Sequence, residues 1–335
     1  MSSNKQAQEH IIFDDNKLAS ILYGEQNTHL TRIEKALKVS ISNRGNEVTI
    51  HGQAQNIKQA RQILDALWDK LLKGEDVEPD TVDSALRFLL NNDPKGKSNG
   101  KKTHNSDQFS EFQSDKTRIT TKKRSVQARS PQQGKYIEAM YNNDLVFGIG
   151  PAGTGKTYLA VAMAVSMFES GKVERIILSR PAVEAGEHLG FLPGEMKEKM
   201  DPYMRPLYDA LHDTMDSDKL KKLIATEEIE IAPLAYMRGR SLNNAFVILD
   251  EAQNATDMQL LMFLTRAGQN SRMIITGDPA QTDLPKGAKS GLKEAQYVLE
   301  GVDSINFTQF STKDIVRSAL VTKILEAYDK KRPLS

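Results

Sequence analysis

The chain has 335 residues, more than one typical domain, and nearly balanced charge, with 45 basic and 44 acidic residues and a net charge of +1. Whole-chain charge therefore indicates neither a nucleic-acid nor a membrane partner, and any such signal must be local. The lack of cysteine excludes disulfides, thiolate metal sites and cysteine nucleophiles. No apolar run reaches the ~18 residues of a membrane span, and the polar N-terminus has no signal-peptide core, so we expect a soluble cytoplasmic protein.

The N-terminal part of the chain favours a small α+β domain over residues 9–90. Segments with strand and helix periodicity follow in the order strand, two helices, two strands and helix, at residues 10–15, 18–24, 28–37, 38–52 (both strands) and 56–72. This order resembles the KH module, which binds nucleotides through a GXXG loop between its first two helices. The corresponding loop here, Gly24-Glu25-Gln26-Asn27, lacks the second glycine and has an acid where phosphate would approach. RNA binding and protein binding both stay open for this domain.

Residues 91–130 lose their aliphatic side chains and fill with Lys, Ser, Thr, Asn and Gln. Such a segment cannot bury enough apolar surface to offset its ordering entropy, so it is predicted to be a flexible linker. The segment is also basic. It is either a solvated tether or a polyelectrolyte arm for phosphate backbones.

Residues 131–330 are typical of a doubly wound α/β domain with a mainly parallel sheet. Short apolar segments without polar alternation alternate with helical stretches, as strands buried on both faces should. The expected strands cover residues 145–149, 175–179, 229–234, 245–250, 272–277 and 304–310.

A phosphate-binding loop follows the first of these strands. The sequence G-x-x-x-x-G-K-T is complete and stands between a strand and an apolar helix, as its mechanism requires. We expect main-chain N–H groups to surround an anion, Lys156 to reach the β- and γ-phosphates, and Thr157 to give a hydroxyl to Mg²⁺. The motif consists of Gly150, Pro151, Ala152, Gly153, Thr154, Gly155, Lys156 and Thr157.

Two further strands end in polar residues that belong to the same predicted site. Asp250 ends a buried strand and is expected to hold Mg²⁺, while Glu251 is placed to activate a water for attack on the γ-phosphate. The alternative for Glu251 is a solvated acid at a strand end. Thr276, near the end of the next strand, and Gln281, which follows that strand, are suited to sensing the γ-phosphate.

With these motifs in place, residues 132–328 resemble the PhoH-like family, P-loop ATPases related to superfamily 1 helicases. Beside GPAGTGKT, ILDEAQN and TGDPAQTDLP, the strings SRPAVEAGEHLGFLPG, DPYMRPLYDAL, IAPLAYMRGRSLNNA and FLTRAG carry the resemblance. It implies a single RecA-like core that hydrolyses ATP with Mg²⁺. By position, it also implies that Gln133 and Tyr136 contact the adenine and that Gln281 senses the γ-phosphate.

The resemblance further implies involvement with RNA, in ribosomal RNA maturation beside a single-strand endoribonuclease. No nuclease domain accompanies the core, so cleavage by this chain alone is not expected. Two other functions stay open: a nucleotide-gated scaffold or protein-remodelling ATPase, and a small-molecule kinase. Adjacent Asp250 and Glu251 argue against the kinase, because a kinase should avoid activating water.

A homo-oligomeric ring, a hexamer, is the expected assembly. The residues after Thr157 complete one core but not the second core with which a superfamily 1 helicase closes its ATP site. A neighbouring subunit would then supply the missing wall and an arginine. The candidate arginines are Arg180, Arg238, Arg240, Arg266 and Arg317.

Overall fold

The computed structural model describes residues 7–90, 115–181, 196–285 and 287–316, together with residues 321, 324 and 327. The chain divides into two compact units, residues 1–115 with 128–131, and residues 116–127 with 132–335. Among the described residues, no helix has both the length and the apolar character needed to cross a membrane.

The first unit has the predicted α+β architecture. An antiparallel sheet with strand order β1-β3-β2 packs with the helices that the periodicity predicted, and α4 adds a helix that was not predicted. The elements are β1 (Ala7–Ile12), α1 (Asn16–Tyr23), η1 (Glu25–Asn27), α2 (Thr28–Leu37), β2 (Ser40–Arg44), β3 (Glu47–Gly52), α3 (Ala54–Leu72) and α4 (Pro79–Leu90).

Alternation along β3 explains how this unit buries its core. Val48 and Ile50 are fully buried, whereas Thr49 between them is not, so one face of the sheet packs on the helices. Ile33 of α2 and Leu64 of α3 are also fully buried. These helices are amphipathic, and tertiary burial of the apolar face stabilises them.

Part of the predicted linker is folded, which corrects the prediction for residues 115–127. This stretch forms η2 (Asp115–Thr117) and a two-stranded sheet of β4 (Arg118–Thr120) and β5 (Ser125–Gln127). Buried Ile119 and Val126 give the hairpin apolar residues that composition alone did not reveal, and β4 contacts α7 (Lys156–Glu169). Residues 91–114 of the predicted linker lie outside the described residues.

Two basic side chains of the hairpin make internal contacts. Lys123 Nζ donates to the carbonyl oxygens of His212 and Met215, at 2.5 and 3.3 Å, where α8 ends, and Arg124 pairs with Asp213 at 2.5 Å. A cation at a helix C-terminus satisfies carbonyls that have no partner within the helix. These contacts favour a structural role for this part of the basic segment over a phosphate-binding arm.

All six strands predicted for the second unit are present, and every strand pair in their sheet is parallel. The strand order is β11-β6-β10-β9-β7-β8, so β10 lies between β6 and β9. The strands are β6 (Leu145–Ile149), β7 (Arg175–Arg180), β8 (Ile229–Pro233), β9 (Ala245–Leu249), β10 (Arg272–Gly277) and β11 (Ile305–Gln309).

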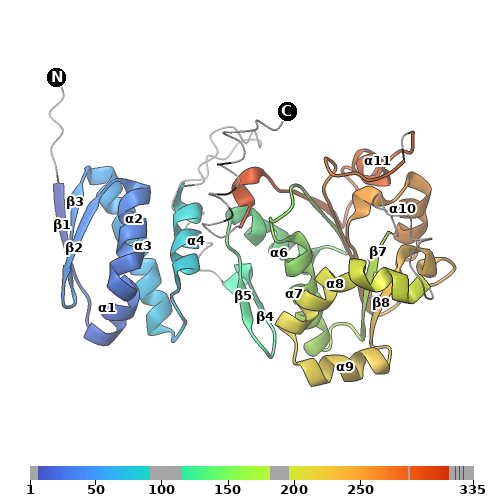
Figure 1. The fold of residues 1–335 in the computed structure, drawn as a ribbon, viewed down its shortest axis with the longest axis horizontal. Helices are drawn as coiled ribbons and strands as arrows, with labels where there is room; N and C mark the ends of the chain where they lie inside the picture. The colour runs from blue at the N-terminus through green and yellow to red at the C-terminus, as the bar shows by residue number, and fades with distance from the viewer. Residues whose placement is uncertain are drawn as a thin grey trace. The chain divides into compact units, whose positions relative to one another are not determined.

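Helices cover both faces of this sheet, as a doubly wound fold requires. α7 packs on β7, β9 and β10, with α8 against α7, while α10 and α11 lie side by side and join the core of the other face (Figure 1). The helices are α6 (Pro131–Asn142), α7 (Lys156–Glu169), α8 (Met196–Thr214), α9 (Ser217–Ala225), α10 (Asp257–Leu264) and α11 (Gly291–Val298).

Candidate functional site

The site lies at the carboxyl edge of the parallel sheet. Four adjacent strands, β6, β10, β9 and β7, end there in Gly150, Asp278, Asp250 and Arg180. Leu249 pairs with Ser179 on one side and Ile275 on the other. The residues after these partners are therefore neighbours, so the register brings Asp250 beside Arg180 and Thr276.

The phosphate loop needs glycine where the backbone turns. Gly150 has φ of +143°, and a Cβ there would lie 2.5 Å from the carbonyl oxygen of Phe310. Gly155, with φ of +83°, precedes the first turn of α7. Val316 N–H donates to the carbonyl of Gly153 at 2.9 Å, so the segment after β11 braces the loop.

Lys156 is a largely buried cation at this loop. It is 8% exposed, and its Nζ donates to the carbonyls of Gly150 and Pro151 at 2.7 and 2.8 Å. Burial lowers the pKa of the ammonium, while Asp278, Asp250 and Glu251 act in the opposite direction. Because its hydrogen-bond partners are neutral oxygens, an anion entering here provides the opposite charge that a buried cation requires.

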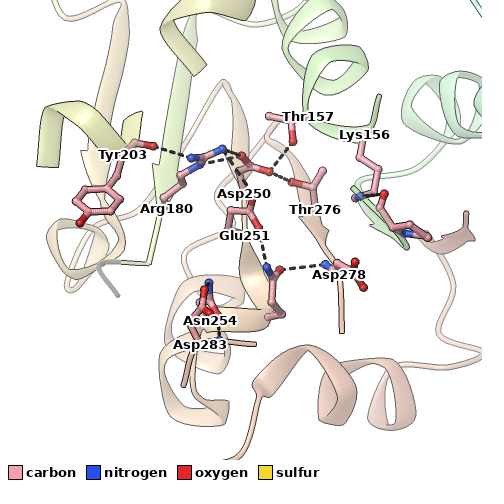
Figure 2. Close-up of polar contacts among 12 residues, drawn as sticks. Lys156, Thr157, Arg180, Tyr203, Asp250, Glu251, Asn254, Thr276, Asp278 and Asp283 are labelled. Carbon is pink, nitrogen blue, oxygen red and sulfur yellow. Dashed lines mark hydrogen bonds and ion pairs between the residues drawn. The ribbon is translucent and has the colours of Figure 1, made fainter. Parts of the chain in front are cut away.

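Asp250 is held by three elements. One carboxylate oxygen accepts from Thr157 Oγ1 at 2.6 Å and from Thr276 Oγ1 at 2.5 Å, and the other accepts from Arg180 (Figure 2). Arg180 also donates through Nη1 to the carbonyl of Tyr203 on α8 at 2.6 Å. The carboxylate is 2% exposed, and these donors replace the water it loses on burial.

Glu251 leaves the strand in a left-handed conformation, with φ of +55°. A non-glycine residue in this region carries a cost of about 1–3 kcal/mol and is more frequent at functional sites. The side chain is 46% exposed, its Oε2 accepts from Gln253 at 2.6 Å, and its Oε1 lies 3.9 Å from Arg180. The acid is therefore not simply solvated.

A cavity of about 620 Å³ opens between the phosphate loop and these acids. Two cations and four carboxylates are among its lining residues, so a bare polyphosphate would meet excess negative charge. A polyphosphate that carries a divalent cation suits this lining better. The lining residues are Ala152, Gly153, Gly155, Lys156, Thr157, Tyr158, Arg180, Pro206, Asp209, Ala210, Asp250, Glu251, Gly277, Asp278 and Gln281.

Thr157 and Asp250 fit a Mg²⁺ ion by their chemistry. Both present oxygen to the cavity, 2.6 Å apart, and Mg²⁺ prefers oxygen donors, usually one or two carboxylates with substrate phosphates and water. Gln281 also lines the cavity, so the predicted residues Lys156, Glu251 and Gln281 meet in one space. Thr276 does not reach it as a sensor, because its buried hydroxyl is used by Asp250.

The adenine contacts expected of Gln133 and Tyr136 need correction. Tyr136 is fully buried, its ring lies edge to face with Phe310 at 5.4 Å, and burial raises the pKa of its hydroxyl well above the usual value. Gln133 is 3% exposed and donates to the carbonyl of Thr154 at 2.9 Å. In this structure Gln133 supports the phosphate loop, Tyr136 packs in the core, and neither is among the residues that line the cavity.

Two residues of the site were missed by sequence reasoning. Arg180 was one of the five candidate arginines, but the sequence did not identify its partner, and here it pairs with Asp250 within the chain. Gln253 received no role, although it is 1% exposed in a polar turn. The available signal was that Gln253 is an amide residue in the ILDEAQN string, where Asp250 and Glu251 already had predicted roles.

The sheet order, the phosphate loop and the acid pair together define a P-loop ATPase with a RecA-like core. The family model described as PhoH-like protein matches residues 125–329. This chain belongs to the PhoH-like family, as the sequence resemblance predicted.

Relatives match well beyond the motifs. The PhoH-like protein of Bacillus subtilis (strain 168) is 46% identical over 96% of this chain and 99% of its own length. The PhoH-like protein of Mycobacterium tuberculosis (strain ATCC 25618 / H37Rv) is 43% identical over 92% of this chain and 84% of its length. Protein PhoH of Escherichia coli (strain K12) is 44% identical over 61% of this chain and 58% of its own length.

The hydroxyl of Thr276 is predicted to stabilise the fold by satisfying the buried carboxylate. Thr276→Val keeps the shape and removes the donor, so the free energy of unfolding should fall by about 2 kcal/mol in denaturant titrations. Thr308→Val, which removes another buried strand hydroxyl whose partner is the neutral Asn306, is the matched control and should cost less. Equal losses would contradict a special role for the charged partner.

Proposed function

We propose that this chain is a Mg²⁺-dependent cytoplasmic ATPase whose turnover is coupled to the remodelling of RNA or ribonucleoprotein. The observation that supports it most is the single cavity lined by Lys156, Thr157, Asp250, Glu251 and Gln281. The loop supplies main-chain donors and an ammonium for phosphates, and the opposite wall supplies carboxylates. No other described part of the chain combines these groups.

The chain's residues divide the work of hydrolysis. Thr157 and Asp250 would hold a Mg²⁺ ion, which when bound would neutralise phosphate charge. Glu251 takes a proton from the attacking water while the oxygen of that water bonds to the γ-phosphorus. The bond between the γ-phosphorus and the β,γ-bridging oxygen breaks, which leaves ADP and phosphate. Lys156 binds the β- and γ-phosphates, and Gln281 reports the presence of the γ-phosphate.

RNA as the substrate rests on the family resemblance and the helicase-like motifs. A single-strand endoribonuclease of ribosomal RNA maturation is the proposed partner, because the family resemblance implies it. The KH-like resemblance of the first unit is weaker support. The loop Glu25–Asn27 and Glu78 line a cavity of about 1020 Å³. Arg32, which also lines this cavity, is already paired with Asp83 at 2.8 Å.

This cavity favours the second candidate function, a nucleotide-gated scaffold or protein-remodelling ATPase. Its described lining offers two acids and one arginine that is paired with an acid, which does not suit phosphate. A protein ligand with basic or amide groups fits this lining better. In that case the first unit selects a protein and the second unit hydrolyses ATP.

Hydrolysis is tested by phosphate release from ATP and Mg²⁺ without an acceptor. Glu251→Gln should retain nucleotide binding and lose turnover by at least about 100-fold, because the water loses its base. Lys156→Ala should lose nucleotide binding, measured by fluorescence titration of an ATP analogue. Glu294→Gln, an exposed acid on α11, is the control and should behave as the wild type. Near-normal turnover in Glu251→Gln would place the base elsewhere.

The coupled substrate is tested by ATP turnover with single-stranded RNA, double-stranded RNA, single-stranded DNA, no nucleic acid, or candidate partner proteins. Stimulation by single-stranded RNA is the expected result. Stimulation by a protein alone would support the second candidate. A variant with Glu25→Lys and Glu78→Lys should strengthen RNA stimulation if the first unit contacts phosphate, because it replaces two acids of that cavity with cations.

The hexameric ring is proposed with Arg238 as the arginine given to the neighbouring site. Arg180, Arg240 and Arg266 make hydrogen bonds within the chain, and Arg317 lies outside the described residues. Arg238 is exposed, and among the described residues no partner of its side chain is found.

The ring predicts complementation between two inactive variants. Arg238→Ala should lower turnover about a thousandfold while its own phosphate loop stays intact. Mixed with Lys156→Ala, which supplies Arg238 but binds no nucleotide, it should regain activity. Light scattering with Mg²⁺ and a non-hydrolysable ATP analogue should show hexamers, and an active monomer would remove this proposal.

A further inference from the structure

The buried amide of Gln253 connects two parts of the site. Gln253 lies in η5 (Ala252–Asn254), directly after the Asp250–Glu251 pair, and is 1% exposed. Its Nε2 donates to Glu251 Oε2 at 2.6 Å, and its Oε1 accepts from the backbone N–H of Asp278 at 3.0 Å. Figure 2 labels Glu251 and Asp278, the two partners of these hydrogen bonds.

The orientation of the amide is set by its backbone partner. The N–H of Asp278 can only donate, so the Gln253 atom that faces it is the oxygen, and the amino group must face Glu251. Gly277 permits this close packing, because a Cβ there would lie 2.7 Å from Gln253 Oε1. The amide is therefore fixed between η5 and the end of β10.

More hydrogen bonds join the same two segments. Thr282 Oγ1 donates to the carbonyl of Gln253 at 3.3 Å, and the N–H of Asp283 donates to Asn254 Oδ1 at 2.8 Å. Gln281, which lines the cavity, lies within the segment from Asp278 to Asp283 that these bonds hold. Glu251 and Gln281 are thus linked through one hydrogen-bonded unit.

We propose that Gln253 is a positioning residue for Glu251. By donating to Oε2 it fixes the carboxylate rotamer and leaves Oε1 to accept the proton of the attacking water. Through Asp278 it also ties the place of this base to the segment that carries Gln281. The inference rests on the proposed ATPase function, in which Glu251 is the base. A base displaced by about 1 Å can lose about 100-fold in rate, so such a support has functional weight.

Gln253→Glu tests the donor half of the contact alone. It keeps the length and the acceptor toward Asp278 but sets a carboxylate oxygen against Glu251. We expect kcat to fall about 10- to 100-fold with KM and ATP-analogue affinity unchanged, because the phosphate contacts are untouched. Gln259→Glu is the matched control: it makes the same change in the capping box of α10, a position that accepts Glu as well as Gln.

A double-mutant cycle separates positioning from a general structural role. In a Glu251→Ala background there is no base to position, so Gln253→Glu should cause no further loss in single-turnover hydrolysis. An equal fold-loss in both backgrounds, or weaker analogue binding, would overturn the proposal. Thermal unfolding monitors the fold, and Gln253→Met, similar in length without donor or acceptor, replaces Gln253→Glu if that variant unfolds.

Failure of the ATPase proposal and failure of the positioning role of Gln253 would give different results. A wild-type chain without phosphate release, or one unaffected by Glu251→Gln, would remove the ATPase proposal. If release stops in Glu251→Gln but persists at the wild-type rate in Gln253→Glu, only the positioning role is lost.

Discussion

The buried carboxylate of Asp250 is the group on which the rest of the site depends. A carboxylate removed from water must be fully hydrogen-bonded, and here the donors come from α7, β7 and β10. Meeting that requirement brings the phosphate loop, the end of β7 and the end of β10 to one place. The same requirement explains why a parallel sheet is suited to the task, because adjacent strands end at a common edge.

Most of this arrangement was predictable from the sequence, since short-range patterns encode it. The six parallel strands and the phosphate loop follow from apolar runs and from residue spacing. The hairpin at residues 115–127 was not predictable, because its two buried apolar residues, Ile119 and Val126, are hidden in a polar, basic segment. Tyr136 was misplaced for a related reason: position in a motif does not tell whether a side chain points to a ligand or into the core, and here it packs under Gly148.

The pairing of Arg180 with Asp250 and the amide bridge of Gln253 also lay beyond sequence reasoning. Both depend on strand register and on a turn geometry that includes a left-handed Glu251. Together they show two layers in the site. One layer holds groups that line the cavity, and behind it a layer of buried polar side chains fixes the direction in which those groups point. The second layer is as specific as the first but leaves little trace in a motif.

The strand order also bears on the order in which the molecule matures during synthesis. The phosphate loop is translated well before β11, the last strand among the described residues, yet β11 pairs with β6, and Phe310 and Val316 contact the loop at Gly150 and Gly153. While the chain is still on the ribosome, the loop lacks this support until translation has passed Val316. A nascent protein therefore acquires its finished nucleotide pocket late, after the rest of its sheet has been made.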